Sequence, residues 1–420
     1  MDFKIISKVL IDSMKIDSIK LPKCDVLTFA CDNDRYIKHN GKMYSPLINT
    51  VEDRLNQQGL SCISISRIAS TIKGELSHGR VYSPEGAFSR AMLAKRIKNL
   101  FISNKKYPFS WLEVKIWEDI LDQTGATSVI AILPSRELCY VCRQRAIWVC
   151  DLQHGVIADE HYWYGESFRK NDPIKWLPNA FLVWDQGSHE VINKWAKHAK
   201  VDVIIVGNPW IERFRNGAKN DSLVNSLKLK YKITKNEKKN ILVSLSWGVH
   251  GLENKFFHPS LERLIKDTAD TYNWKLRLHP NQMRGFASDE GREFIGYYKK
   301  HFEGLDVEWE NSTAMPLPLL LSSIDCHITW VSSVCMEAAY FGVPSLVLCP
   351  KLQQGGEYES YYNYLADLGY VDKLNPDYNT IKEWIGRKSL SKLPYYCDYA
   401  VNFDGIIQGI VERASETPIQ

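Results

Sequence analysis

The alternation of short apolar runs with longer helical segments is the feature that most constrains the fold of this 420-residue chain. Runs of strand length recur through the first half, and segments with helical periodicity lie between them. The strands are expected at Cys24–Phe29, Cys62–Ile65, Ser128–Leu133, Ile147–Asp151, Ala180–Trp184 and Val203–Val206. This alternation is typical of α/β domains with parallel sheets.

The second half restarts the same pattern after Lys228–Lys239, a lysine- and asparagine-rich stretch that we interpret as a solvated linker rather than a lipid-binding patch. Its strands are expected at Asn240–Ser244, Trp274–Leu278, Ile324–Trp330 and Ser345–Leu348. A chain of this length exceeds one ordinary core. We therefore predict an α/β fold of two Rossmann-like domains, residues 1–225 and 226–398, facing across a cleft. Residues 399–420 are expected to form a closing helix that packs back on the first domain.

Bulk composition excludes several classes of protein. The net charge of +4 gives no indication of nucleic-acid binding, and 45% hydrophobic with 24% charged residues is typical of a globular protein. No apolar run approaches the roughly 20 residues that a membrane span needs. Cys139 and Cys142 form a CxxC without a second pair, so we predict free thiols and no metal site. These features indicate a cytoplasmic protein, compatible with peripheral association with the inner membrane.

The most informative segment is Ile324–Leu348. After its strand, Ser332 and Ser333 are natural residues to begin a helix. A helix that starts at a strand end offers N–H groups and a positive dipole end to a phosphate. Glu337 lies one turn further, where it could accept hydrogen bonds from a ribose diol. The alternative is a capped structural unit in which Glu337 faces solvent.

Two further strand ends of the second half are expected to face the same cleft. Arg277 ends one strand, and His279 follows it directly before Pro280, which disfavours continuation into a helix at that residue. The His279 imidazole could donate to a phosphate oxygen or a nucleotide carbonyl. Ser246 and Gly248 follow the first strand of this half, where small residues allow main-chain amides to approach a pyrophosphate.

The first half supplies the candidates for catalysis. His154 and Gly155 follow the strand that ends near Asp151, and a histidine there could remove a proton from an acceptor hydroxyl. Asp159 could instead act as a nucleophile in a double-displacement route. Glu160 and His161 are competing candidates. We expect this arrangement to require no metal.

Other polar segments are expected to border the cleft. Trp184–Gln186 and Gly207–Trp210 end strands, and would line the cleft or form a hinge. The polar loop Asp32–Lys42, together with Tyr44, follows the first strand and is plausible for acceptor contact.

With these motifs assembled, the chain resembles bacterial surface-polysaccharide glycosyltransferases of the GT-B fold. His279-Pro280 is similar to the HP motif, and Ser332-Ser333 to the serine motif, of sialyl-, polysialyl- and Kdo transferases, where these motifs hold the CMP moiety. Glu337 resembles the glutamate that grips the ribose in the wider GT-B pattern. Those sialyltransferases carry an acidic pair before a glycine, whereas this chain has Gln153-His154-Gly155. A His-Gly there resembles the glycerophosphate polymerases of teichoic acid synthesis, which use CDP-linked donors.

The resemblance implies transfer of a CMP-activated acidic sugar, such as Kdo or sialic acid, to a lipopolysaccharide or capsule glycan, with the nucleotide sugar as substrate and no resident cofactor. The expected nucleotide-binding residues are Ser246, Gly248, Arg277, His279, Pro280, Ser332, Ser333 and Glu337, and the expected catalytic residues are His154 and Asp159. The alternatives are a UDP- or GDP-sugar transferase of the same fold, a nucleotide-sugar 2-epimerase, and a non-enzymatic scaffold that has lost the activity.

Overall fold

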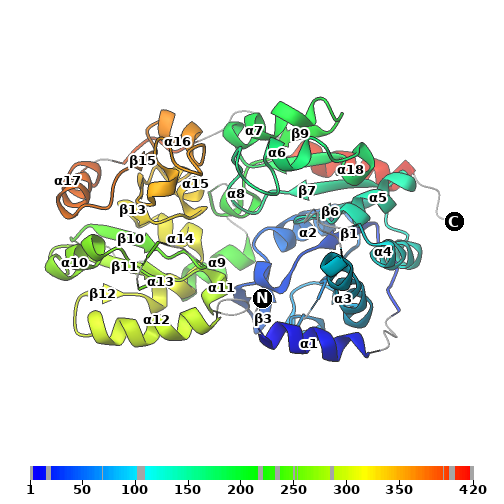
Figure 1. Cartoon of the computed structure of the whole chain (residues 1–420), viewed down its shortest axis with the longest axis horizontal. Coiled ribbons are helices and arrows are strands. Elements are labelled where there is room, and N and C mark those ends of the chain that lie inside the picture. Colours follow the sequence, from blue (N-terminus) through cyan, green and yellow to red (C-terminus); the bar gives the residue numbers. More distant parts are fainter. Residues whose placement is uncertain are drawn as a thin grey trace.

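The computed structural model shows two lobes side by side along the long axis, each built around one parallel sheet (Figure 1). The structure describes residues 3–15, 20–68, 70–101, 109–215, 221–231, 237–248, 251–252, 254–283, 288–390, 392–396 and 403–416. The predicted α/β fold of two Rossmann-like domains is confirmed.

In the described residues, the sheet of the first lobe has seven strands in the order β5-β4-β1-β6-β7-β8-β9. Their bounds are β1 Val26–Phe29, β4 Cys62–Ile65, β5 Val81–Tyr82, β6 Ser128–Ala131, β7 Trp148–Leu152, β8 Ala180–Val183 and β9 Asp202–Ile205. Every pair of neighbours is parallel. The chain crosses from β5 back over β1 to β6, which is the strand order of a Rossmann fold with one further strand at the edge.

Helices cover both faces of this sheet. They are α1 Phe3–Ser13, α2 Ile48–Gln57, α3 Glu85–Phe101, α4 Trp111–Thr124, α5 Arg136–Gln144, α6 Glu166–Arg169, α7 Gln186–Ala196 and α8 Pro209–Arg215. Leu27 of β1 packs in one apolar cluster with Trp117 of α4. Its neighbour Val26 points to the other face, in a cluster with Ile48 of α2 and Ile407 of α18 (Phe403–Glu416). Helix α18 therefore follows the second lobe in sequence but packs on the first (Figure 1).

The second lobe repeats the arrangement with the strand order β12-β11-β10-β13-β14-β15. Its strands are β10 Asn240–Ser244, β11 Asn273–Arg277, β12 Val307–Glu308, β13 Cys326–Thr329, β14 Ser345–Val347 and β15 Val371–Lys373. Its helices are α9 Ser222–Lys230, α10 Pro259–Asp267, α11 Pro280–Met283, α12 Ser288–His301, α13 Glu310–Ala314, α14 Leu317–Leu321, α15 Val334–Ala339, α16 Asn363–Asp367 and α17 Tyr378–Lys388. Every pair of neighbouring strands is parallel. The strand order reverses between β10 and β13, which is where a Rossmann fold binds its ligand.

A hairpin replaces the polar loop predicted at Asp32–Lys42. Strands β2 (Ile37–His39) and β3 (Lys42–Tyr44) pair antiparallel around Asn40 and Gly41, whose φ angles are 48° and 78°. The Tyr44 side chain is fully buried, and its hydroxyl donates to Asp53 at 2.8 Å. The prediction that Tyr44 contacts an acceptor is wrong, because its side chain is part of the core.

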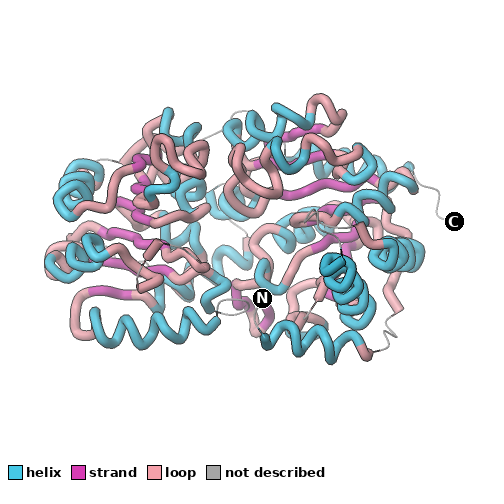
Figure 2. Tube along the Cα trace, viewed as in Figure 1, coloured by secondary structure: helices cyan, strands magenta, loops and turns pink. Residues whose placement is uncertain are grey.

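Part of the predicted linker Lys228–Lys239 is helical, while its residues 232–236 lie outside the described residues. Lys228–Lys230 form the last turn of α9, and the predicted boundary at residue 225 falls inside this helix. Leu223 and Leu227 of α9 pack with Trp210 of α8 and with Leu319 of α14 in one buried cluster. Apolar contacts therefore tie the lobes together beside the connection. Helices and loops lie between the strands of the two lobes in Figure 2.

The described cysteines are unpaired. Cys139 and Cys142 of the CxxC are buried on α5, and burial raises the pKa of the Cys139 thiol to about 12. Within the described part of the chain there is no group of three or more His, Cys, Asp and Glu side chains that could hold a metal ion. In that same part, no helix has both the length and the apolar character needed to cross a bilayer.

The buried His327 of β13 ties three strands of the second sheet together, since its ring nitrogens lie 2.7 Å from Ser244 Oγ on β10 and 2.9 Å from Ser345 Oγ on β14. Replacing His327 with alanine is expected to lower the free energy of unfolding by about 2–4 kcal/mol, because it leaves a cavity and two buried hydroxyls without their partner. Urea unfolding followed by tryptophan fluorescence measures this. The control is the exposed His198→Ala, and equal midpoints for both variants would contradict the role of His327.

Candidate functional site

The segment Val331–Ser333, called the serine loop below, is joined to the loop that follows β10. The Ser246 hydroxyl donates to the carbonyl of Val331 and accepts from the N–H of Val331 at 3.3 Å. These loops leave the carboxyl ends of β13 and β10, which are neighbours at the switch point of the sheet. Ser246 therefore shapes the candidate site by holding its two loops together.

The hydroxyls of Ser332 and Ser333 are used differently. Ser332 Oγ accepts from the N–H of Val334 at 3.3 Å, and so supports the first turn of α15. Ser333 stands at the N-cap position, and its side chain makes no cap hydrogen bond. Because no hydrogen bond of this hydroxyl is recorded among the described residues, Ser333 is the serine whose side chain is available to a ligand.

Glu337 lies on α15, one turn after Ser333, and its side chain is only 8% exposed. Burial raises the pKa of its carboxyl to about 7, and the positive charge of Arg277 acts in the opposite direction. In the described part of the structure no hydrogen bond to this carboxyl is recorded. The alternative in which Glu337 faces solvent is therefore wrong, and a buried carboxyl of this kind is expected to have a hydrogen-bonding partner.

Arg277, predicted to bind the nucleotide, is buried inside the second lobe. Its guanidinium is buried and donates to the carbonyls of Ser312 and Met315, the latter at 2.8 Å. These bonds hold the connection between α13 and α14. Arg277 therefore acts on the site through its charge, which favours the ionised form of Glu337.

His279 stands at the carboxyl end of β11, and Pro280 begins the short helix α11. The N–H of Asn281 donates to His279 Nδ1 at 3.1 Å. Burial, assisted by the charge of Arg277, lowers the pKa of His279 to about 4. The neutral ring therefore carries its proton on Nε2, which can donate to a ligand oxygen.

Gly248, predicted to offer its amide to a pyrophosphate, has a φ of 62° in the left-handed region. Its N–H already donates to the Glu290 carboxylate of α12 at 3.2 Å. Gln282 donates to the same carboxylate at 3.3 Å. In this conformation an acidic side chain therefore holds the position predicted for a phosphate.

Across the cleft, Gln153 fixes the loop that carries His154. Its amide nitrogen donates to the carbonyl of Gly155 at 2.9 Å, and its amide oxygen accepts from the N–H of Trp184 at 2.7 Å. His154 is half-buried, with Nδ1 at 3.3 Å from Tyr164 Oη. Burial lowers the pKa of His154 to about 4, so its ring is neutral at physiological pH.

The other candidates for catalysis in the first lobe have partners already. Lys194 Nζ lies 2.6 and 2.8 Å from the two carboxylate oxygens of Asp159. Glu160 accepts from the hydroxyl of Ser360 in the second lobe. The structure therefore records Asp159 in an ion pair and Glu160 in a contact between the lobes. Among the described residues, no hydrogen bond joins His154 to either carboxylate.

Sequence reasoning missed Asp151, which lies at the end of β7 just before the His154 loop. Burial raises the pKa of its carboxyl to about 7. It accepts from the N–H of Leu133 at 3.0 Å and from Nε1 of Trp163 at 3.2 Å. The signal available in the sequence was an aspartate near the end of an apolar strand. Its two bonds join the loops that follow β6 and β7.

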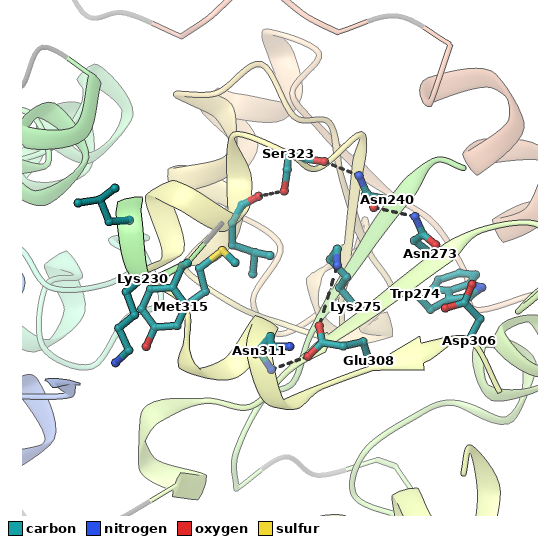
Figure 3. A pocket seen from close by; sticks show the side chains of 13 residues that line it. Lys230, Asn240, Asn273, Trp274, Lys275, Asp306, Glu308, Asn311, Met315 and Ser323 are labelled. Carbon is teal, nitrogen blue, oxygen red and sulfur yellow. Dashed lines mark hydrogen bonds and ion pairs between the residues drawn. The ribbon is translucent and has the colours of Figure 1, made fainter. Parts of the chain in front are cut away.

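Cavities lie on two sides of the second lobe. One, of about 240 Å³, lies between α7 and α16, and Asp159, Met336 and Tyr362 are among its lining residues. The other, of about 540 Å³, lies at the amino-terminal ends of the second sheet, where Asn240 bonds to both Ser323 and Asn273 (Figure 3). Because open α/β sheets bind ligands at the carboxyl ends of their strands, this larger cavity is not the predicted donor site.

No protein-family model matches the chain, and no curated protein matches it by sequence. Solved structures do match. A variant of the wall teichoic acid polymerase TagF gives a TM-score of 0.58 at 13% identity, over 94% of this chain and 89% of that one. The UDP-GlcNAc 2-epimerase from Neisseria meningitidis bound to UDP-GlcNAc gives 0.54 at 14% identity, over 94% and 100%. The corresponding epimerase from Methanocaldococcus jannaschii gives 0.54 at 11%, over 94% and 100%.

The fold is of the GT-B type. At these identities the likeness concerns the path of the chain and the facing of the two lobes. The predicted fold class is confirmed, while the chemistry depends on the residues of the site.

Proposed function

We propose that the chain is a glycosyltransferase that moves a sugar from a nucleotide donor to a glycan or glycolipid acceptor. The observation that carries this proposal is Glu337, a buried carboxyl without a recorded partner, placed one turn after the available hydroxyl of Ser333. Both lie at the switch point of the second sheet, the position where Rossmann-like sheets bind nucleotides.

In this proposal the second lobe holds the nucleotide. Glu337 accepts hydrogen bonds from the ribose diol, and its ionised form is favoured when those bonds are made. His279 donates from Nε2, and Ser333 from its hydroxyl, to phosphate oxygens. As the bond between the sugar and the phosphate breaks, these two donors stabilise the negative charge that builds on the leaving group.

His154 of the first lobe acts as the general base. With its Nδ1–H donated to Tyr164, Nε2 carries the lone pair and takes the proton of the acceptor hydroxyl as its oxygen attacks the sugar carbon. The route in which Asp159 is the nucleophile would first require its ion pair with Lys194 to break. Closure of the lobes excludes water and protects the donor from hydrolysis.

For the donor we retain a CMP-linked acidic sugar, on the grounds of the His279-Pro280 and Ser332-Ser333 motifs. The match to TagF, a variant of which was soaked with CDPG, is compatible with this choice. The reaction would take place at the cytoplasmic face of the inner membrane, on a lipopolysaccharide or capsule acceptor, and it invokes no resident cofactor.

A thermal-shift panel of CMP, CDP, UDP, GDP and ADP tests this proposal. CMP is expected to raise the melting temperature of the wild type, with the shift lost in His279→Ala and Glu337→Ala. A preference for CDP, UDP or GDP would keep the nucleotide site and replace the donor. If no nucleotide shifts the wild type, the proposed function is overturned.

A nucleotide-sugar 2-epimerase is the second candidate, because the matched epimerases have the same fold and one of them holds UDP-GlcNAc. An epimerase needs no acceptor. Incubation with UDP-GlcNAc alone, followed by proton NMR of the sugar, separates the two functions. An epimerised product would favour this candidate, and an unchanged sugar would favour transfer.

A further inference from the structure

A short segment of the second lobe, Tyr358–Tyr364, here called the bridge segment, contacts both the serine loop and the first lobe. On one side, the Tyr362 hydroxyl accepts from the N–H of Ser332 at 3.1 Å and donates to the carbonyl of the same residue at 2.9 Å. One side chain thus bonds both main-chain groups of Ser332, and so fixes the orientation of the two peptide units that flank Ser332, the second of which leads into Ser333.

On its other side, the bridge segment reaches the first lobe through Ser360. Its hydroxyl donates to the Glu160 carboxylate and accepts from the N–H of Asp159 at 3.0 Å. The N–H of Ser360 donates to Glu160 at 3.4 Å. Glu160 lies in the same loop as Tyr164, whose hydroxyl lies 3.3 Å from Nδ1 of His154.

The backbone of Tyr362 is held in an unusual conformation. Its φ is 63° and its ψ is 10°, in the left-handed region that bulky residues rarely adopt. The side chain is nevertheless buried, at 6% exposure. Strained residues of this kind persist where the surrounding structure over-determines them, and they cluster at functional sites.

From these contacts we infer that Tyr362 is a positioning residue of the nucleotide site, and that the bridge segment couples occupancy of the serine loop to the loop of the first lobe that supports His154. This inference rests on the proposed function. A phosphate seated on Ser333 holds the serine loop, Tyr362 holds the bridge segment against that loop, and Ser360 passes the restraint to Glu160.

The first experiment needs no nucleotide. Amide hydrogen exchange of the full chain is compared for the wild type, Tyr362→Phe and Tyr361→Phe. The control, Tyr361→Phe, removes the hydroxyl of the adjacent tyrosine. Among the described residues, no hydrogen bond of that hydroxyl is recorded. Peptides covering the serine loop are expected to exchange at least roughly tenfold faster in Tyr362→Phe, because this variant loses both hydrogen bonds to Ser332. In Tyr361→Phe their exchange is expected to be unchanged. Equal exchange in all three proteins would overturn the positioning role.

The second experiment adds CMP or UDP and compares the wild type with Ser360→Ala. In the wild type, nucleotide is expected to protect both the serine loop and residues 156–164. In Ser360→Ala, it is expected to protect the serine loop while the protection of residues 156–164 is lost. Retained protection of residues 156–164 in the variant, or none in the wild type despite a protected serine loop, would overturn the coupling.

A titration completes the test, because a purely structural role would lower stability without a selective effect on binding. Tyr362→Phe is expected to raise the dissociation constant for CMP or UDP roughly tenfold, beside a small fall in melting temperature from the loss of its buried hydrogen bonds. A fall in the melting temperature of Tyr362→Phe with unchanged affinity for the nucleotide would overturn the inference. If no nucleotide of the thermal-shift panel binds the wild type, the proposed function and the coupling both fail, while the exchange of the nucleotide-free protein still decides whether Tyr362 positions the serine loop.

Discussion

Replacement of His154 by alanine is expected to lower the turnover rate by about 10²–10⁴-fold, the usual contribution of a general base. The affinity for the nucleotide should stay within about twofold of the wild type, because His154 belongs to the opposite lobe from Glu337 and His279. The measurement is steady-state transfer with the donor that the nucleotide panel identifies. The matched control is His161→Ala, a nearby histidine whose pKa burial also lowers to about 4. A larger loss in His161→Ala than in His154→Ala would transfer the role of base to His161.

The pH dependence of the rate gives an independent check on His154. Burial lowers the pKa of this imidazole to about 4, so the base is in its active neutral form at all higher pH values. The acidic limb of the rate profile is therefore expected near pH 4, well below the value of about 6.5 for an exposed histidine. An acidic limb near pH 6.5 that disappears in His154→Ala would show that the imidazole of His154 is exposed to solvent during catalysis.

Replacement of Glu337 by alanine is expected to weaken nucleotide binding by about 10–100-fold, because hydrogen bonds to a charged group contribute about 1.5–3 kcal/mol. Isothermal titration of the wild type, Glu337→Ala and Glu337→Gln measures the loss. The glutamine variant keeps the shape of the side chain and one acceptor oxygen, and should fall between the other two. Equal affinities for all three proteins would place the ribose elsewhere.

The carboxyl of Glu337 also predicts how affinity changes with pH. Burial raises its pKa to about 7, so the carboxyl is mostly protonated at pH 6 and mostly ionised at pH 8. Because the ionised form accepts both ribose hydroxyls, affinity should rise with pH, by roughly tenfold over this range. Phosphate ionisation contributes equally in Glu337→Gln, so the difference between the two proteins isolates Glu337. A rise of the same size in both would contradict the role.

The sequence-level prediction of the fold rested on the long strands, and these were found where apolar runs indicated them. The strands it missed are short edge strands and a hairpin. Val81–Tyr82 and Val307–Glu308 hold too few residues to show a pattern. The hairpin around Asn40-Gly41 did have a signal, because Asn-Gly is a favoured hairpin turn. The polar residues around that turn led to its interpretation as a loop.

The candidate site could be predicted in outline but not in its contacts. The predicted strand ends put Ser333, His279 and His154 just after β13, β11 and β7, and the structure has them there. Glu337 lies one turn further, on α15. Their roles in binding and catalysis stay predictions. Nothing local to the sequence indicates that Glu290 bonds the amide of Gly248, since the two positions are joined only through tertiary packing. The serine loop likewise depends on a tyrosine that lies about thirty residues further on, in a conformation that propensity disfavours.

Helix α18 gives the protein an unusual order of assembly during synthesis. Ile406, Ile407 and Ile410 complete an apolar face of the first lobe that also contains Val26 and Ile48. The ribosome makes the entire second lobe before it makes these isoleucines, which takes on the order of ten to thirty seconds at usual rates. During that interval the first lobe carries an uncovered aliphatic strip on the nascent chain. We expect this strip to recruit holding chaperones, and a chain released before residue 403 to aggregate rather than to yield a separate first lobe.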